Sequence, residues 1–292
     1  MPSLAEAPTS IPGFDTGAIL DQSRTENFTV ASMVLPRRVR AHLLGIYGFA
    51  RLADDIGDEA EGDRLEQLDW LEAELERAAC GSASHPLLRR LTPTLIELGL
   101  PLEPFRSLIK ANRVDQIVTR YETFEDLVEY CRLSAVPVGR LVLAVFDATT
   151  ADRVSLSDDV CIGLQVVEHL QDVAEDARRG RVYLPQRDMR AFGVDEEGLA
   201  ASGASPELRR LVAVQANRAR GLLASGSSLA RSLPWQPRTA VAGFTGGGLA
   251  AIDAIRHAGY DVLGTHCRPR RIRIGVHLLR TLLGSPSDGM AT

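Results

Sequence analysis

The sequence predicts an all-α protein, and three observations lead to this fold class. Apolar residues recur at helical spacing in one segment after another. The alternating pattern of a half-buried strand is hard to find anywhere in the chain. Residues that start or stop helices, such as Pro36 and Gly180, separate the periodic segments.

The first helix should run through RVRAHLLGIYGFARLADDI, with Pro36 in its first turn and an apolar stripe that includes Leu43 and Ile46. A long helix should begin near Ser157, which can cap it, and end near Arg179, before Gly180. Further helices are expected near 63–80, 85–98, 103–120, 123–133, 137–148, 205–232, 237–258 and 269–283.

We expect one domain, because the short Gly/Ser-rich pieces lie inside helical patterning and none looks like a linker. The predicted domain covers 21–284, as a single all-α unit with helices around a deep central cavity. We expect residues 1–20 and 285–292 to be disordered.

Composition excludes several classes of protein. The chain of 292 residues is 45% hydrophobic and 24% charged, which suits a globular protein with a sizeable core. Its net charge of -5 gives no global positive field, so we expect no nucleic-acid partner. The four cysteines are widely spaced with no C-x-x-C pair, and the start lacks a basic and apolar leader, so we expect a cytoplasmic protein.

Two helical segments carry carboxylates at four-residue spacing. Asp54 and Asp58 share one helix face in RLADDIGDEA. Glu168, Asp172 and Asp176 follow the same step in LQVVEHLQDVAEDARRG.

Such a run is often a solvated helix face, and for a lone D-x-x-x-D we would favour that interpretation. Here each acidic stripe continues an apolar one, which favours the polar mouth of a buried pocket. Hard oxygen ligands from separate helices suit Mg²⁺ held together with substrate phosphates, so we expect a diphosphate substrate. Nearby arginines could neutralise the remaining phosphate charge: Arg51, Arg178, Arg179 and Arg181.

The glycine-rich segment 243–252 follows no predicted strand and begins a helical pattern. It therefore does not fit a nucleotide-binding loop, and close helix packing is the favoured role for these glycines.

Five sequence blocks, in order, resemble the squalene and phytoene synthase family, the head-to-head trans-isoprenyl diphosphate synthases. The blocks are ENFTVASMVLP at 26–36, IYGFARLADDIGDE at 46–59, RYETFEDLVEYCRLSAVPVGRLVL at 120–143, LQDVAEDARRGRVYLPQ at 170–186 and GGLAAIDAIRHAGYDVL at 247–263. The resemblance spans about 20–285, and its paired acidic motifs are specific when found together.

Within the family, the ENF-x-x-AS opening and the SA-x-PVGRL block are most similar to HpnC-type hydroxysqualene or squalene synthases of hopanoid biosynthesis. The resemblance implies the isoprenoid synthase fold and an Mg²⁺-dependent conversion of presqualene diphosphate to hydroxysqualene. In that reaction the diphosphate ionises, the carbocation rearranges and water captures it, so NADPH is not expected. A presqualene diphosphate synthase would be the functional partner that supplies the substrate.

The resemblance also assigns residues by position. It implies that the metal ligands are Asp54, Asp58, Asp172 and Asp176, with Glu168 in a place where the family usually has asparagine. It implies the catalytic residues Tyr47, Arg51, Tyr130 and Tyr183, and the substrate-binding residues Asn27, Phe28, Ser32, Arg51, Gln165 and Arg181. The extra charge of Glu168 implies a metal affinity or stoichiometry different from that of the family, and the adjacent His169 points about 100° away from that face, as a packing residue would.

Several alternatives stay open at this point. The chain could instead make presqualene diphosphate, squalene or phytoene by condensing two prenyl diphosphates, or it could be a helical scaffold that only binds divalent ions. The basic, amphipathic segment CRPRRIRIGVHLLRTLLG could rest on an anionic membrane, which would make the protein peripheral to the inner membrane. We favour a last helix packed on the core with its arginines outward.

Overall fold

The structure, a computed structural model, describes residues 35–264, 267 and 271–283. These residues form helices and no strand, although an isolated parallel bridge pairs Arg120 with Val182. The predicted all-α class is therefore confirmed for the described chain. The ends expected to be disordered, 1–20 and 285–292, lie outside these residues.

The described chain divides into two compact units. One comprises the residues up to Ile117 together with Arg140–Asp147, and the other comprises Val118–Gly139 and the residues from Ala148 onward. The prediction of one domain with a central cavity stays a prediction, and we describe each unit by itself.

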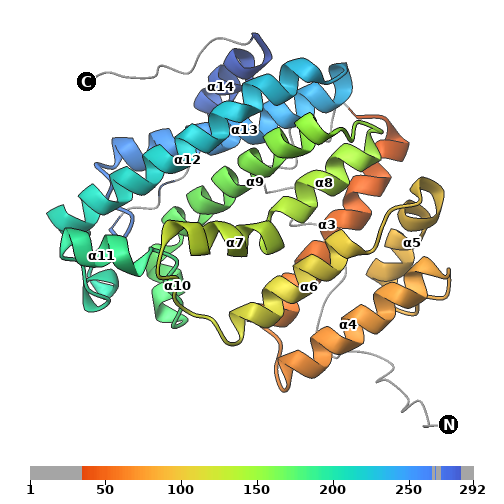
Figure 1. The fold of residues 1–292 in the computed structure, drawn as a ribbon, viewed down its shortest axis with the longest axis horizontal. Helices are drawn as coiled ribbons and strands as arrows, with labels where there is room; N and C mark the ends of the chain where they lie inside the picture. The colour runs from red at the N-terminus through yellow and green to blue at the C-terminus, as the bar shows by residue number, and fades with distance from the viewer. Residues whose placement is uncertain (1–34, 265–266, 268–270, 284–292) are drawn as a thin grey trace. The chain divides into compact units, whose positions relative to one another are not determined.

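The first unit is built on α3 (Arg37–Asp58), which contacts α4 (Arg64–Ala79), α5 (Pro86–Leu98) and α6 (Glu103–Asp115) (Figure 1). Phe49 of α3 and Phe105 of α6 are fully buried and meet edge to face, with ring centroids 5.1 Å apart. This packing fixes the face of α3 that is buried, and thereby also the face that carries the first acidic motif.

The second unit contains most of the other helices. They are α7 (Phe124–Ser134), α9 (Ala151–Gln171), α10 (Val173–Arg178), α11 (Gln186–Phe192), the short 3₁₀ helix η1 (Glu197–Ala200), α12 (Pro206–Ser232), α13 (Trp235–His257) and α14 (Arg271–Leu283). The most extensive packing is between α9 and α12 and between α13 and α14, and α12 also packs on α13 (Figure 1). Helix α8 (Val136–Val145) begins in this unit and ends in the first.

The glycine-rich segment of α13 serves helix packing, as predicted. A Cβ atom on Gly248 would lie 2.7 Å from Leu164 Cδ2 of α9 and 3.0 Å from Leu223 Cδ1 of α12. One on Gly246 would lie 2.8 Å from the backbone nitrogen of Leu278 in α14. Larger residues here would push the helices apart.

Several predicted helix ends are wrong. The helix expected to start at Ser157 starts at Ala151, because Thr150 caps it and Ser157 is buried within it. It also breaks at Asp172, which ends α9 and precedes α10. Pro36 is the N-cap residue of α3 rather than part of its first turn.

The prediction for the last helix is also wrong in part. Helix α14 packs on α13 and α12 as expected, but its arginines do not simply face outward. Arg273 reaches inward to Asp253, and Ile272 and Leu283 are among the most exposed apolar residues described. None of the described helices is both long enough and apolar enough to span a bilayer.

Candidate functional site: two acidic motifs and an aromatic cluster

The first acidic motif lies in the last two turns of α3. Solvent reaches the Asp54 side chain, and Asn112 of α6 donates a 3.1 Å hydrogen bond from Nδ2 to Asp54 Oδ1. Desolvation by the surrounding protein raises the pKa of Asp54 to about 7, an effect that the Asn112 hydrogen bond opposes and the charge of Asp58 reinforces. A carboxylate in this state is only partly ionised at neutral pH unless a cation lies beside it.

Asn112 is itself held in place. Its side-chain amide also donates to its own helix at Leu108 O, and Gln116 Nε2 donates to both Asn112 O and Gly57 O. A Cβ on Gly57 would lie 2.1 Å from Asn112 Oδ1. The glycine therefore makes room for the amide that hydrogen-bonds the first aspartate.

Arg51 forms an ion pair with Asp55, a residue that the acidic pattern did not single out. Its Nε lies 2.8 Å from Oδ1 of Asp55, which is 6% exposed. Burial raises the pKa of Asp55, and the charge of Arg51 opposes that rise. Tyr47, one turn before Arg51, is half-buried on α3, as is Asp58. The predicted catalytic roles of Arg51, near the diphosphate, and of Tyr47, as an aromatic residue that lines the site, stay predictions.

The second motif lies at the junction of α9 and α10. Glu168 and Asp172 are exposed, and Asp176 is half-buried. The backbone keeps the four-residue step through the break, because Asp172 N donates to Glu168 O and Asp176 N donates to Asp172 O. Burial raises the pKa of Asp172, the charge of Glu175 adds to the rise, and the charge of Arg179 opposes it.

The arginines after the second motif interact with oxygen atoms of the same helix, α10. Arg178 Nε donates to Ala174 O, and Arg179 Nη2 lies 3.0 Å from Glu175 Oε1. Gly180, with a φ of 79°, then reverses the chain. The backbone of Arg181 donates to Asp176 O, which ties the residue predicted to bind diphosphate to the second motif.

Four rings form an aromatic cluster, which we define as Tyr121, Tyr130, His169 and Tyr183. His169 stacks on Tyr183 with centroids 3.8 Å apart, and Tyr130 lies 5.6 Å from Tyr183. Tyr121 lies 5.3 Å from Tyr130. The structure therefore brings together two of the predicted catalytic tyrosines, in contact with rings from two other segments.

His169 is a packing residue, as predicted. Its side chain is 10% exposed, and burial lowers its pKa to about 3, so the ring is neutral at pH 7. Its Nδ1 lies 4.0 Å from Asp176 Oδ2, and Gln165 Nε2 lies 3.4 Å from its Nε2. The ring thus connects the aromatic cluster to Gln165 and to the second motif.

The cluster depends on a long-range pairing that sequence periodicity does not reveal. Val182 N donates to Thr119 O, and Gln186 N donates to Tyr121 O, so the segment after α10 lies along the segment after α6. This pairing places Tyr183 and Tyr121 side by side with ring centroids 5.8 Å apart. It also explains why α6 ends at Asp115 rather than continuing to 120.

The donor chemistry fits a hard divalent cation, although the described residues contain no group of three or more His, Cys, Asp or Glu side chains placed to hold a metal. Asp54 and Asp172 each have a raised pKa caused mainly by desolvation, which a bound cation would offset. That the two motifs meet at one site stays a prediction.

Two residues of the site were not predicted. Asn112 lies on a segment without a motif of its own, and Tyr121 lies in the family block at 120–143 but was not singled out there. Asn27, Phe28 and Ser32, predicted to bind substrate, lie outside the described residues.

Comparisons with known proteins identify the family of the chain. A sequence profile of the squalene/phytoene synthase family matches residues 22–276. The chain is 40% identical over 214 residues to hydroxysqualene synthase of Rhodopseudomonas palustris. This aligned region covers 72% of each of the two chains.

Two solved structures are similar to the chain. One is squalene synthase HpnC from Alicyclobacillus acidocaldarius, with a TM-score of 0.77, 41% identity and coverage of 84% of this chain and 94% of that one. The other is a dehydrosqualene synthase in complex with ligand, with a TM-score of 0.82, 25% identity and coverage of 91% and 93%. These likenesses confirm the predicted isoprenoid synthase fold.

Proposed function

The chain belongs to the squalene/phytoene synthase family, and on this premise we propose that it converts presqualene diphosphate to hydroxysqualene with Mg²⁺. The observation that carries the proposal is the 40% identity with a hydroxysqualene synthase, together with the two acidic motifs. A non-catalytic scaffold is set aside, because the family is one of isoprenoid synthases.

The reaction balances without a reductant. The carbon–oxygen bond to the diphosphate breaks, the rearranged carbocation takes the oxygen of one water, and that water loses a proton. NADPH is therefore not required. The enzyme would act in the cytoplasm on a prenyl diphosphate supplied by a presqualene diphosphate synthase.

The two acidic motifs would bind the metal, through Asp54, Asp58, Glu168, Asp172 and Asp176. Bound Mg²⁺ would supply positive charge that stabilises the departing diphosphate. Arg51 and Arg181 would add charge-assisted hydrogen bonds to the same group. Gln165, Asn27, Phe28 and Ser32 would contact the rest of the substrate.

The aromatic cluster would supply the second requirement, which is protection of a carbocation. A ring face of Tyr130 or Tyr183 turned to the substrate would stabilise a cation by about 0.5–2 kcal/mol. The low pKa of His169 keeps the stacked ring uncharged, so it adds no positive charge that would repel the cation. Tyr47 would serve the same purpose from α3.

A condensing reaction is the second candidate. The likeness to a dehydrosqualene synthase favours it, because that similarity covers 91% of this chain. In that case the substrate would be two prenyl diphosphates, and the product would be presqualene diphosphate, squalene or phytoene.

The test is a substrate comparison with purified full-length protein. Presqualene diphosphate and farnesyl diphosphate are each incubated with Mg²⁺, and products and released diphosphate are measured. We expect turnover of presqualene diphosphate, loss of activity with a chelator and recovery with added Mg²⁺. Efficient turnover of farnesyl diphosphate alone would favour the condensing reaction instead.

Variants make the test specific to the first motif. Asp54→Asn should lower turnover about 100-fold or more, because one charge that holds the metal is removed. Asp69→Asn is a matched control, since this exposed carboxylate of the same unit pairs with Arg113. Equal activity in both variants would contradict the role of Asp54.

A further inference from the structure

An open pocket of about 770 Å³ lies between α3 and α5, within the first unit. One face of each helix contributes the polar residues that line it: Arg38, His42, Arg90, Thr94 and Glu97. Ala41 and Pro93 add apolar surface. His42 precedes Asp54 by three turns of α3, which is about 18 Å along the helix, so the pocket is separate from the first acidic motif.

His42 brings a buried and unsatisfied nitrogen atom to this pocket. The residue is 6% exposed, and its Nε2 has no hydrogen-bond partner in the described part of the chain. Glu97 Oε2 lies 3.9 Å from this nitrogen, which is beyond hydrogen-bond distance. Because buried polar atoms are nearly always paired, the nitrogen marks a place that a polar atom from outside the chain should fill.

Thr94 determines which nitrogen of the His42 ring carries the proton. Thr94 is 1% exposed, and its Oγ1 lies 3.1 Å from His42 Nδ1. Among the described residues this ring nitrogen is the hydrogen-bond partner of the hydroxyl, so the hydroxyl donates and Nδ1 accepts. The neutral ring is then protonated at Nε2. The unsatisfied atom is therefore a donor, and an oxygen atom of an anion would satisfy it.

The helices around the pocket carry an excess of positive charge. Glu97 is the one carboxylate in residues 37–49 and in α5, and the arginines of the same two segments are Arg37, Arg38, Arg40, Arg89 and Arg90. Arg90 is exposed, and within the described ranges its guanidinium has no hydrogen bond or ion pair. The lining of the pocket therefore includes a cation that is available to a ligand.

The Glu97 carboxylate indicates how an anion would bind here. Its Oε2 lies 2.8 Å from Arg38 Nη2 and faces His42 Nε2 at the longer distance given above. Both side chains of the Arg38–Glu97 pair are exposed, so the pair contributes little stability and can be displaced. An anion that replaced this carboxylate would contact Arg38 and His42, and it would also gain the charge of Arg90.

We propose that the pocket between α3 and α5 binds the phosphate group of a small free anion. A phosphate dianion matches the charges of Arg38 and Arg90 and still has an oxygen atom to accept from His42 Nε2. A carboxylate has one negative charge and two oxygen atoms, so it satisfies fewer of these groups. The volume of the pocket leaves room for a small organic group attached to the phosphate. This site is independent of the reaction that the protein catalyses.

The experiment is nuclear magnetic resonance of the histidine rings in the full-length, metal-free protein labelled with ¹⁵N-histidine. The His42 signal is identified by its absence from His42→Gln and, independently, by its shift in Thr94→Val. We expect this ring to be protonated at Nε2. Inorganic phosphate at pH 8 and constant ionic strength should shift the signal in a saturable way. Acetate should bind about tenfold more weakly, because it carries one charge.

Three variants test the origin of the binding. Arg90→Gln should raise the Kd for phosphate about tenfold, because it removes the available cation. Arg89→Gln is the matched control, since Arg89 is an exposed arginine that lies about 100° around α5 from Arg90, and it should change the Kd less than about twofold. Glu97→Gln should lower the Kd about threefold, because it removes the carboxylate that competes for Arg38.

Several results would overturn the proposal. A His42 ring protonated at Nδ1 would have no donor for the ligand. Phosphate that shifted other histidine signals but left His42 unchanged would be bound elsewhere in the chain. Equal changes of the Kd in Arg90→Gln and Arg89→Gln would mean that phosphate is attracted by the basic surface in general, and equal binding of acetate would contradict the phosphate chemistry.

Discussion

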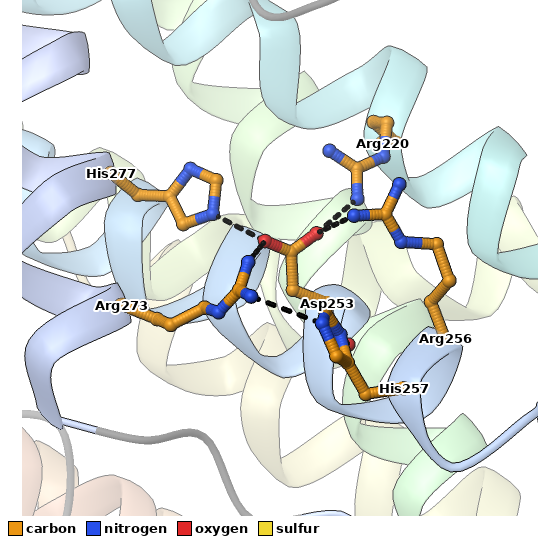
Figure 2. Close-up of polar contacts among 6 residues, drawn as sticks. All are labelled: Arg220, Asp253, Arg256, His257, Arg273 and His277. Carbon is orange, nitrogen blue, oxygen red and sulfur yellow. Dashed lines mark hydrogen bonds and ion pairs between the residues drawn. The ribbon is translucent and has the colours of Figure 1, made fainter. Parts of the chain in front are cut away.

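Replacing Asp253 with asparagine removes the charge at the centre of a cluster that joins α12, α13 and α14. Asp253 is 4% exposed and lies within hydrogen-bond distance of His277 and Arg220 (Figure 2). Asparagine preserves the shape, but it leaves the arginines without their counter-charge. We expect the variant to fold with a lower free energy of unfolding.

The size of the loss follows from the ionisation of Asp253. Burial acts to raise its pKa, but hydrogen bonds from His277 and Arg220 outweigh burial and lower it from 3.8 to about 2. At about 1.36 kcal/mol per pKa unit, this difference corresponds to about 2 kcal/mol of stability at pH 7. Arg256 and Arg273 are 55% and 44% exposed, so their pairing with Asp253 adds little.

The sign of the pH dependence is fixed by the lowered pKa. The ionised carboxylate stabilises the fold fully above about pH 5, and this contribution is lost as pH falls toward 2. At pH 3 about half should remain. Because asparagine does not titrate, the gap between wild type and Asp253→Asn should narrow over the same range.

Urea unfolding followed by circular dichroism at pH 7 and pH 3 measures this gap. Glu207→Gln is the control, because Glu207 pairs with Arg210 on the same unit at 2.9 Å but is 40% exposed, and its loss should cost less than about 1 kcal/mol. A gap below about 1 kcal/mol for Asp253→Asn at pH 7, or one that is equal at both pH values, would show that the ionised Asp253 carboxylate does not stabilise the fold.

Three further predictions concern the acidic motifs. Asp172→Asn should lose about 100-fold or more in turnover while its melting temperature stays near that of the wild type, and near-normal turnover would refute its role in metal binding. Gly57→Ala should displace Asn112 from Asp54 and lower both stability, by about 1–3 kcal/mol, and turnover; wild-type values for both would show that the contact is dispensable. Added Mg²⁺ should raise the melting temperature of the wild type more than that of Glu168→Asn, and identical shifts would mean that Glu168 does not bind the metal.

Gly221→Ala serves as the control for the glycine variant. Gly221 lies inside α12, and a Cβ there would meet no atom within 4 Å. Alanine should therefore stabilise the helix by about 0.5–1 kcal/mol and leave turnover unchanged.

Helical periodicity predicted the helices well because it reports local burial, which each segment satisfies along one face. The ends of helices were predicted less well. Ser157 looked like a cap, but Thr150 takes that role, and Asp152 in the first turn was the signal that favoured the earlier start. The end of α6 at Asp115 depends on the pairing of Thr119 with Val182, which no local pattern encodes.

The acidic motifs were visible in the sequence because each lies within a few turns of one segment. Their supporting groups were not, because Asn112 is 58 residues from Asp54 along the chain. The orientation of α14 was hidden for the same reason. Its direction is set by Asp253 and Arg220 on other helices, so amphipathicity alone could not show which face of α14 is buried.

Isotope labelling shows directly whether water captures the carbocation. Presqualene diphosphate is incubated with the protein and Mg²⁺ in H₂¹⁸O, with and without NADPH, and the C30 product is analysed by mass spectrometry. We predict hydroxysqualene with one ¹⁸O in its hydroxyl group, formed equally in both incubations. An unlabelled hydrocarbon that forms only when NADPH is present would contradict water capture and identify a reductive synthase.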